Sequence, residues 1–145
     1  MPHLTRDDTV FVLHLNEEGA TDTENVLGPP QVAQINDLLD EVLASEGPAA
    51  LVTTGAGKFF STGLDTGWVL EHVDQVDAYT QSVQELLARL LTFPMPTAAA
   101  VQGHAFGGGA LVAIAHDHIV MRADRGYICM PGITIGASYA PGSVL

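Results

Sequence analysis

Two glycine-bearing segments carry the residues whose types and spacing could do chemistry, FFSTGLD at 59–65 and HAFGGGA at 104–110. Each follows a strand-like run and places glycine where the chain must turn, which leaves backbone N–H groups free near the end of an element. Two such amides converging on one oxygen stabilise an enolate or a tetrahedral anion, and loss of one donor typically costs about 3 to 4 kcal/mol of barrier. A glycine-rich turn taken alone is more often only a tight connection, but the pair predicts an oxyanion site.

Other residues of chemical interest fit structural roles better. Ser61 has no GxSxG elbow and no base paired with it in sequence, so a polar turn residue is favoured over a nucleophile. His116, Asp117 and His118 are metal ligands by type, but they fall at a helix-to-strand junction where they can satisfy carbonyls and turns. Neither glycine turn continues as GK[ST] or as GxGxxG in a Rossmann setting. We therefore predict no metal site and no nucleotide-phosphate site of those kinds.

Short apolar runs alternate with amphipathic stripes, and these elements must position the two turns. Strands are expected at 10–15, 49–54, 97–103, 118–123 and 126–130. Apolar residues recur at three- and four-residue steps in two predicted helices, and the triple glycine opens a third that ends near Asp117. The expected buried faces are Val32, Ile35, Leu38, Leu39, Val42 and Leu43 in the first helix, and Val76, Tyr79, Val83, Leu86, Leu87, Leu90 and Leu91 in the second. The βαβαβαβ order predicts an α/β fold with a mainly parallel sheet.

Length and composition indicate one globular domain over 1–145. The 145 residues are 47% apolar and 15% charged, which suffices for an ordinary core. No run is long enough to span a membrane and no leader pattern opens the chain, so we expect a cytoplasmic protein. The formal net charge of −12 argues against nucleic acid or an anionic membrane as partner. Cys129 is the single cysteine, and its apolar neighbours suggest an inert, buried thiol.

Both turns, in their order and spacing, resemble the crotonase (enoyl-CoA hydratase/isomerase) family. GKFFSTGLD (57–65) is similar to its first oxyanion turn, and AVQGHAFGGGALVAIAHDHIVM (100–121) to its glycine-rich helix start. RGYICMPGITIG (125–136) resembles the family's PEIxIG segment, and ENVLGPPQVAQINDLLDEV (24–42) the loop and helix after the first strand. The resemblance covers nearly the whole chain, although family chains normally continue for almost as long again in a C-terminal helical part. It is closest to the enoyl-CoA isomerases.

The resemblance implies a ββα superhelix assembled as homotrimers or hexamers, and a CoA thioester as ligand. No cofactor beyond the coenzyme A moiety of the substrate is implied. By position, the backbone amides of Leu64 and Gly108 would donate to the thioester oxygen. The remaining residues implied to line the ligand path are Val26, Ser61, Gly63, Asp65, Gly107 and Gly132.

Two departures from the family pattern affect the chemistry. Leu111 stands where hydratases carry one glutamate, and Gly132 stands where the second glutamate, the proton shuttle of the isomerases, would be. Hydration is therefore not expected. An isomerase needs a single base to move a proton between two carbons. His104 and Tyr139 are weaker candidates for that base than for packing or surface roles, and a carboxylate beyond residue 145 is another.

Three functions stay open at this point. The leading expectation is an enzyme of the enoyl-CoA isomerase type in fatty acid metabolism, with Leu64 and Gly108 forming the oxyanion hole. The second is a non-catalytic acyl-CoA-binding or scaffold member, because both glutamate positions are changed. The third is an oligomeric structural relic that binds nothing.

Overall fold

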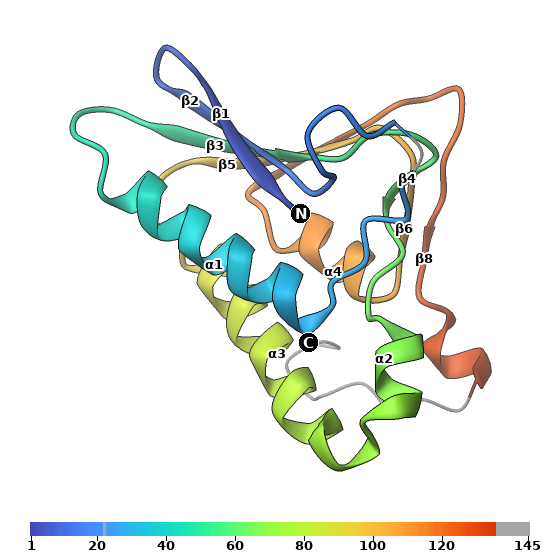
Figure 1. The fold of residues 1–145 in the computed structure, drawn as a ribbon. Coiled ribbons are helices and arrows are strands. Elements are labelled where there is room, and N and C mark those ends of the chain that lie inside the picture. Colours follow the sequence, from blue (N-terminus) through green and yellow to red (C-terminus); the bar gives the residue numbers. More distant parts are fainter. Residues whose placement is uncertain (22, 136–145) are drawn as a thin grey trace.

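The structure is a computed structural model that describes residues 1–21 and 23–135, and it contains two sheets (Figure 1). The larger sheet consists of β1 (His3–Asp7), β2 (Val10–His14), β3 (Ala50–Thr54), β5 (Thr97–Val101) and β7 (His118–Met121), in the order β1-β2-β3-β5-β7. The smaller sheet consists of β4 (Phe59–Ser61), β6 (His104–Phe106) and β8 (Ile128–Cys129), in the order β4-β6-β8. The helices are α1 (Pro29–Leu43), α2 (Thr66–Glu71), α3 (Val76–Leu91) and α4 (Gly108–Ile114), with 3₁₀ turns η1 (Val73–Gln75) and η2 (Pro131–Ile135).

A strand of the larger sheet, a strand of the smaller sheet and then helix form the repeated unit. It occurs as β3-β4-α2-α3 and as β5-β6-α4, while an isolated parallel bridge between Val26 and Gly63 takes the place of the small strand before α1. Every strand pairing among the described residues is parallel except β1 with β2. The predicted ββα superhelix with a mainly parallel sheet is confirmed.

The sequence pattern missed the first strand and two strands of the smaller sheet, while the strand predicted at 126–130 is confirmed as the shorter β8. β4 and β6 are three-residue strands inside the segments that read as glycine turns, and so they are too short to show a periodicity of two. β1, with the charged sequence HLTRD, lies at the sheet edge and is half-buried or exposed along its length. Tertiary pairing with β2, and not local hydrophobicity, explains why it is a strand.

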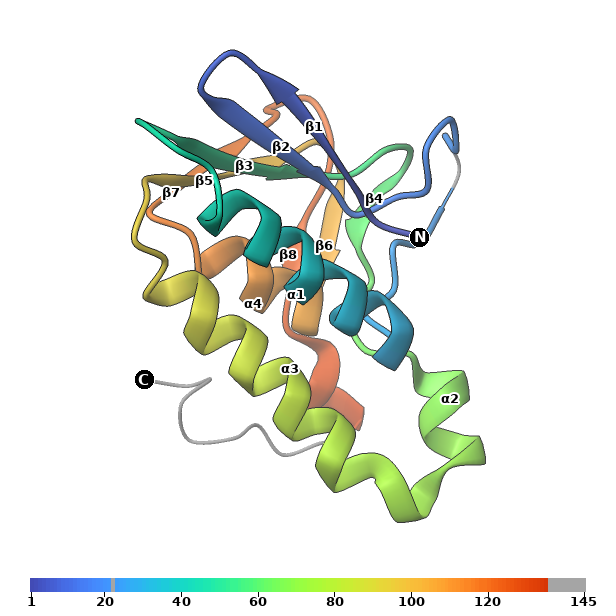
Figure 2. The same ribbon diagram turned by 60° about the vertical axis from the view of Figure 1, so that its left-hand side comes forward.

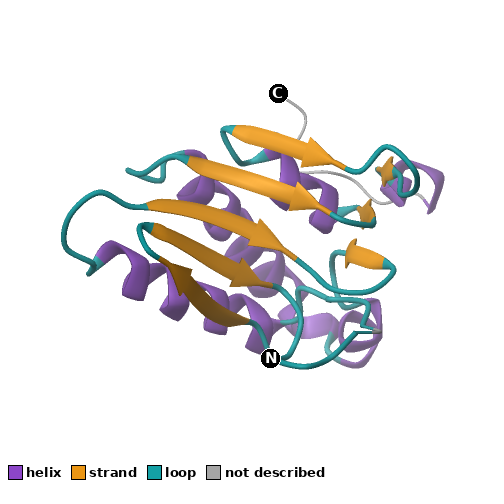
Figure 3. Ribbon diagram, turned by 90° about the horizontal axis from the view of Figure 1, so that it is seen from above, coloured by secondary structure: helices purple, strands orange, loops and turns teal. Residues whose placement is uncertain are grey.

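Helices α1 and α3 lie side by side against one face of the larger sheet (Figures 2 and 3). Most of the two predicted stripes is buried, including Leu39 and Leu86, each with no exposed surface. Leu43 and Leu91 are wrongly predicted, since 38% and 64% of their surfaces are exposed. Each follows a buried residue of its own helix directly, and the step of about 100° per residue turns it away from the sheet.

The prediction of a buried Cys129 is also wrong. Its side chain is exposed on β8, which is the edge strand of the smaller sheet. Apolar neighbours in the sequence do not bury a thiol where no described element covers the strand. Among the described residues, no helix combines the length and the apolar character that crossing a bilayer requires.

Candidate active site

The two glycine turns lie in direct contact with each other. Gly63 has φ +86°, and a Cβ built on it would lie 2.7 Å from both Gly108 N and Phe106 O. A side chain is therefore excluded at this position twice, by backbone conformation and by space. The fold brings the ends of β4 and β6 together, as two neighbouring parallel strands require.

The backbone amides of Leu64 and Gly108 come close together at this contact. A Cβ built on Gly108 would lie 3.6 Å from Leu64 N, which places the two nitrogens no more than about 6 Å apart. The carbonyl of Gly63 accepts a hydrogen bond from Leu27 N at 2.8 Å, so the Leu64 N–H on the opposite side of that trans peptide points away from Leu27. Neither amide donates a hydrogen bond to another described residue. Two unpaired donors at this separation are able to share one acceptor.

The three consecutive glycines have different structural causes. Gly107 adopts φ +50°, although a Cβ there would meet nothing within 4 Å. Gly109 is needed for packing, because its Cβ would lie 2.5 Å from the carbonyl oxygen of Ser61 and 2.6 Å from the Ser61 Cβ. Gly108 has ordinary space around it, with no contact shorter than 3.5 Å. The triplet therefore serves the contact between the turns as well as access to the backbone.

Ser61 supports the first turn from within the protein. Its side chain is fully buried, and its hydroxyl donates to Asn25 O at 2.7 Å and accepts from Gly63 N at 3.1 Å. Asn25, at φ +50°, donates from its side chain to Phe59 O at 2.9 Å and Phe60 O at 3.2 Å. Ser61 is thus a polar turn residue, and its hydroxyl joins β4 to the loop before α1 by a hydrogen bond.

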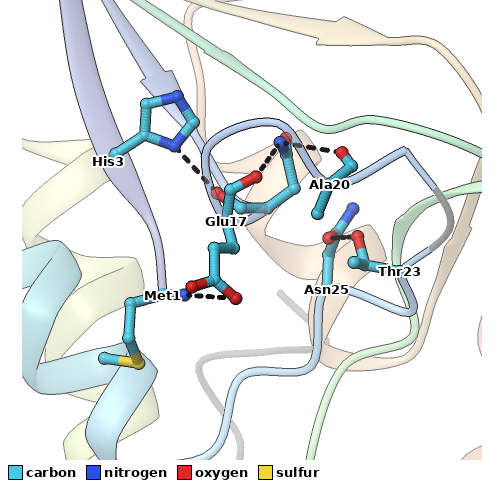
Figure 4. A network of polar contacts seen from close by, with 7 residues as sticks. Met1, His3, Glu17, Ala20, Thr23 and Asn25 are labelled. Carbon is cyan, nitrogen blue, oxygen red and sulfur yellow. Dashed lines mark hydrogen bonds and ion pairs between the residues drawn. The ribbon is translucent and has the colours of Figure 1, made fainter.

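The loop leading to Val26 is held by its own polar side chains (Figure 4). Thr23 donates to the Asn25 side-chain oxygen, and Asn16 donates to Glu17 O at 2.9 Å and Ala20 O at 3.4 Å. A shallow hollow beside this loop is lined in part by Asn16, Asn25 and Val26. Val26 lies beside Gly63 through the isolated bridge, so the structure brings these two predicted ligand-path residues together.

Asp65 and Tyr79 hold the chain on the other side of Leu64. Asp65 is the N-cap of α2, where its carboxylate accepts from Trp68 N at 2.9 Å. The Tyr79 hydroxyl accepts from Asp65 N at 2.9 Å and donates to Leu27 O at 2.5 Å. The sequence marked Tyr79 only as part of an apolar stripe. A tyrosine on such a stripe needs a hydrogen-bond partner for its hydroxyl, and this need was the available signal.

The two positions where the family carries glutamates are apolar or side-chain-free in this chain. Leu111 is half-buried and packs against the hydrophobic core, and Gly132 is buried. Neither residue supplies a proton-transfer group. Tyr139, a weaker candidate for the base, lies outside the described residues.

His104 packs among aromatic rings on the smaller sheet. Its ring centroid lies 5.5 Å from that of Phe59, 5.3 Å from that of Phe106 and 5.3 Å from that of Tyr127. Its Nδ1 is buried without a hydrogen-bond partner among the described residues. Nearby, Lys58 Nζ lies 5.1 Å from the Phe59 ring centroid. These contacts give His104 a packing role, and Lys58 is a cation close to the first turn.

The His116-Asp117-His118 run serves the junction between α4 and β7. The ring nitrogens of His116 contact Thr53 Oγ1 at 2.8 Å and Val112 O at 2.7 Å. The Asp117 carboxylate accepts from Thr97 N at 2.7 Å and from its hydroxyl at 3.1 Å. Burial lowers the pKa of His116, whereas the hydrogen bonds from Thr97 lower the pKa of Asp117. His116 and Asp117 therefore make the internal contacts expected at such a junction, and His118 is exposed.

The fold and the paired turns define a member of the crotonase class. The Enoyl-CoA hydratase/isomerase family model matches residues 6–144, and the chain belongs to this family. Among curated relatives, it is 36% identical over 138 residues to "Enoyl-CoA delta isomerase 3" of Arabidopsis thaliana, covering 92% of this chain and 56% of that protein. It is 38% identical over 117 residues to a "Putative enoyl-CoA hydratase" of Thermus thermophilus, covering 77% of this chain and 45% of that protein.

Solved structures show the same fold. The apo enoyl-CoA isomerase of Mycobacterium tuberculosis superposes with a TM-score of 0.83 at 28% identity, over 98% of this chain and 59% of that one. An enoyl-CoA hydratase/isomerase from Xanthobacter autotrophicus superposes with a TM-score of 0.84 at 26% identity, over 94% of this chain and 51% of that one. The chain thus spans about half the length of these relatives, between 45% and 59%.

Proposed function

We propose that this chain binds an acyl-CoA thioester and holds the thioester oxygen between the backbone amides of Leu64 and Gly108, as an enzyme of the enoyl-CoA isomerase type. The observation that carries the proposal is the contact between the two glycine turns. It leaves two N–H groups close together and without partners among the described residues. Similarity to proteins named enoyl-CoA delta isomerases supports the choice of reaction.

The two amides would act electrostatically, by stabilising negative charge on the thioester oxygen. In converting a 3-enoyl to a 2-enoyl thioester, a base takes a proton from carbon 2, and the negative charge that develops moves to the thioester oxygen. The same proton is returned at carbon 4, so no other reactant is consumed. Amide donors about 2.7 to 3.1 Å from that oxygen would stabilise the enolate more than the neutral thioester. We assign the proton transfer to no described residue.

A second function is favoured by one specific observation. Leu111 and Gly132 occupy both glutamate positions of the family, so the chain would bind the thioester without turning it over. In this form the protein is a non-catalytic acyl-CoA-binding or scaffold member. Binding and polarisation of the carbonyl are common to both candidates, and proton transfer separates them.

The test compares turnover with binding in the same preparation. We expect calorimetry to detect an acyl-CoA that binds more tightly than the matching free fatty acid, and a 3-enoyl-CoA to be converted to its 2-enoyl isomer. Binding without conversion above background removes the isomerase and leaves the binding protein. If acyl-CoA does not bind at all, both candidates are wrong.

We also propose that the chain assembles as a homotrimer or hexamer in the cytoplasm. Apolar side chains on and beside the edge strands β7 and β8 are exposed, among them Val120 at 67%, Tyr127 at 69% and Ile128 at 42%. An interface between subunits would cover this surface. Two of the Arabidopsis relatives are named peroxisomal, which makes that organelle the alternative compartment. Sedimentation velocity measures the oligomer size, and imaging of a tagged protein in its own cells measures the compartment.

A further inference from the structure

Tyr79, on α3, is a buried polar residue that contacts the first glycine turn of the candidate site. Only 3% of its surface is exposed. Its hydroxyl makes two hydrogen bonds, donating to Leu27 O at 2.5 Å and accepting from Asp65 N at 2.9 Å. One partner, Leu27, lies in the loop before α1, and the other, Asp65, is the last residue of the first glycine turn.

Both peptide planes that flank Leu64 are fixed by hydrogen bonds. Leu27 N donates to Gly63 O at 2.8 Å, which orients the peptide that carries the Leu64 N–H. The following peptide, between Leu64 and Asp65, is held at Asp65 N by the Tyr79 hydroxyl. Since Tyr79 also holds Leu27 O, it stabilises the residue that orients the first plane. One hydroxyl therefore acts on both sides of Leu64.

The surroundings keep this hydroxyl in one place and in one protonation state. The Trp68 ring lies edge-on against the Tyr79 ring, with centroids 5.0 Å apart and planes at 71°. Burial raises the pKa of Tyr79, so the phenol stays protonated and able to donate at neutral pH. Asp65 also accepts a hydrogen bond from Trp68 N as the N-cap of α2, so Asp65, Trp68 and Tyr79 are all in contact with one another.

We propose that Tyr79 is a positioning residue, which orients the Leu64 amide toward the thioester oxygen through its hydrogen bonds to Leu27 O and Asp65 N. This inference rests on the proposed function for its purpose, but the orientation of the amide is measurable without a ligand. An amide fixed before the substrate arrives needs no reorganisation when charge develops on the oxygen. Tyr79 would thus contribute to catalysis without touching the substrate.

The test is Tyr79→Phe, which removes only the hydroxyl, with Tyr127→Phe as the matched control on a tyrosine that is 69% exposed. The first readout is the residual dipolar coupling of the Leu64 and Gly108 amides in the ligand-free protein. We expect the Leu64 coupling to change in Tyr79→Phe, while the Gly108 coupling stays the same and Tyr127→Phe matches the wild type. A folded Tyr79→Phe with an unchanged Leu64 coupling overturns the inference.

The second readout is the infrared stretch of a thioester carbonyl labelled with ¹³C, bound to each variant. We expect the shift caused by binding to be smaller in Tyr79→Phe, and isomerisation, where measured, to lose about 10- to 100-fold in kcat with KM changed less than about threefold. A general loss of structure would instead raise KM and lower the amount of folded protein. If kcat and the carbonyl shift match those of the wild type, Tyr79 does not position the amide.

The two proposals fail in different ways. If the wild-type protein binds acyl-CoA without any carbonyl shift, the proposed function is wrong, and the amide couplings still decide whether Tyr79 orients Leu64. Should Tyr79→Phe not fold, 3-fluorotyrosine at position 79 keeps the ring and both bonds while weakening the acceptor oxygen. We then expect a smaller change of the Leu64 coupling, and no change at all contradicts the inference.

Discussion

Neighbouring glycines in the triplet should respond in opposite ways to the addition of a single methyl group. In Gly109→Ala, the new Cβ would lie 2.5 Å from Ser61 O, 2.6 Å from Ser61 Cβ and 2.8 Å from Ser61 Oγ. Two of these atoms belong to a fully buried side chain and one to the backbone, so none can move away cheaply. In Gly108→Ala, the nearest atoms are Gly63 Cα and Leu27 Cδ1 at 3.5 Å and Leu64 N at 3.6 Å, which are ordinary contacts.

These distances set the expected free energies of unfolding. Forcing a methyl group into a filled space typically costs about 1 to 3 kcal/mol, and Gly109→Ala belongs at the upper end because three contacts fall below 3.0 Å. Replacing glycine by alanine within a helix stabilises the folded state by roughly 0.5 to 1 kcal/mol. We therefore expect Gly109→Ala to lose about 2 kcal/mol of stability, whereas Gly108→Ala is unchanged or gains up to about 1 kcal/mol.

Urea unfolding, followed by the fluorescence of Trp68, measures both variants, because Trp68 is the single tryptophan of the chain. The same preparations should differ in binding. The Gly108→Ala methyl lies 3.6 Å from the Leu64 nitrogen that the acyl oxygen must approach, so a folded Gly108→Ala should bind acyl-CoA at least about tenfold more weakly. A Gly109→Ala as stable as the wild type, or a Gly108→Ala that loses as much, would refute the reasoning.

Three further predictions follow from the same contacts. Ser61→Ala removes a buried hydroxyl that serves Asn25 O and Gly63 N, so we expect about 1 to 3 kcal/mol less stability on urea unfolding, and an unchanged midpoint would contradict this. Burial holds the pKa of His116 below 6.5. As the pH falls below about 6.5, the unfolded chain therefore binds a proton at this residue more readily than the folded chain does. We expect the free energy of unfolding to fall by at most about 1.4 kcal/mol per pH unit. His14, whose pKa burial also lowers, adds to this slope, so the comparison is His116→Gln, which should flatten it, against the exposed His118→Gln, which should not. Cys129 is exposed, and we expect it to react with a chromogenic disulfide in the native protein at nearly the rate seen in urea; protection of the native thiol would show that β8 is covered in solution.

The sequence predicted the elements that show a long hydrophobic period. α1 and α3 extend over 15 and 16 residues with regular apolar spacing, and the predicted apolar faces, which run over 32–43 and 76–91, fall within them. β4 and β6 have three residues each, and the pairing of segments distant in the chain creates them, whereas β8 lies within the strand predicted at 126–130. No window of local sequence contains that information.

The candidate site was predicted only in part, because some of its contacts also join segments that are distant in the chain. Glycine in both turns was visible as an opportunity for free amides, and the resemblance to a family assigned Leu64 and Gly108 among them. The reason for Gly109 was not visible, because this glycine of α4 contacts Ser61 on β4, a segment distant in the chain. Tyr79 was counted as one more apolar residue, since periodicity describes which face is buried and not which polar group that face must satisfy.

The contact of Gly109 with Ser61 makes the candidate site a product of tertiary structure alone. Its two halves lie on separate ββα units, and neither half holds an amide pair without the other. A ligand recognised there would bind the native state and not the unfolded chain, so at saturation it would raise the melting temperature by mass action. Measuring the melting temperature in the presence of different CoA thioesters therefore offers a quick screen of acyl groups. A rise in melting temperature would indicate that the thioester binds this site, which exists only in the folded chain.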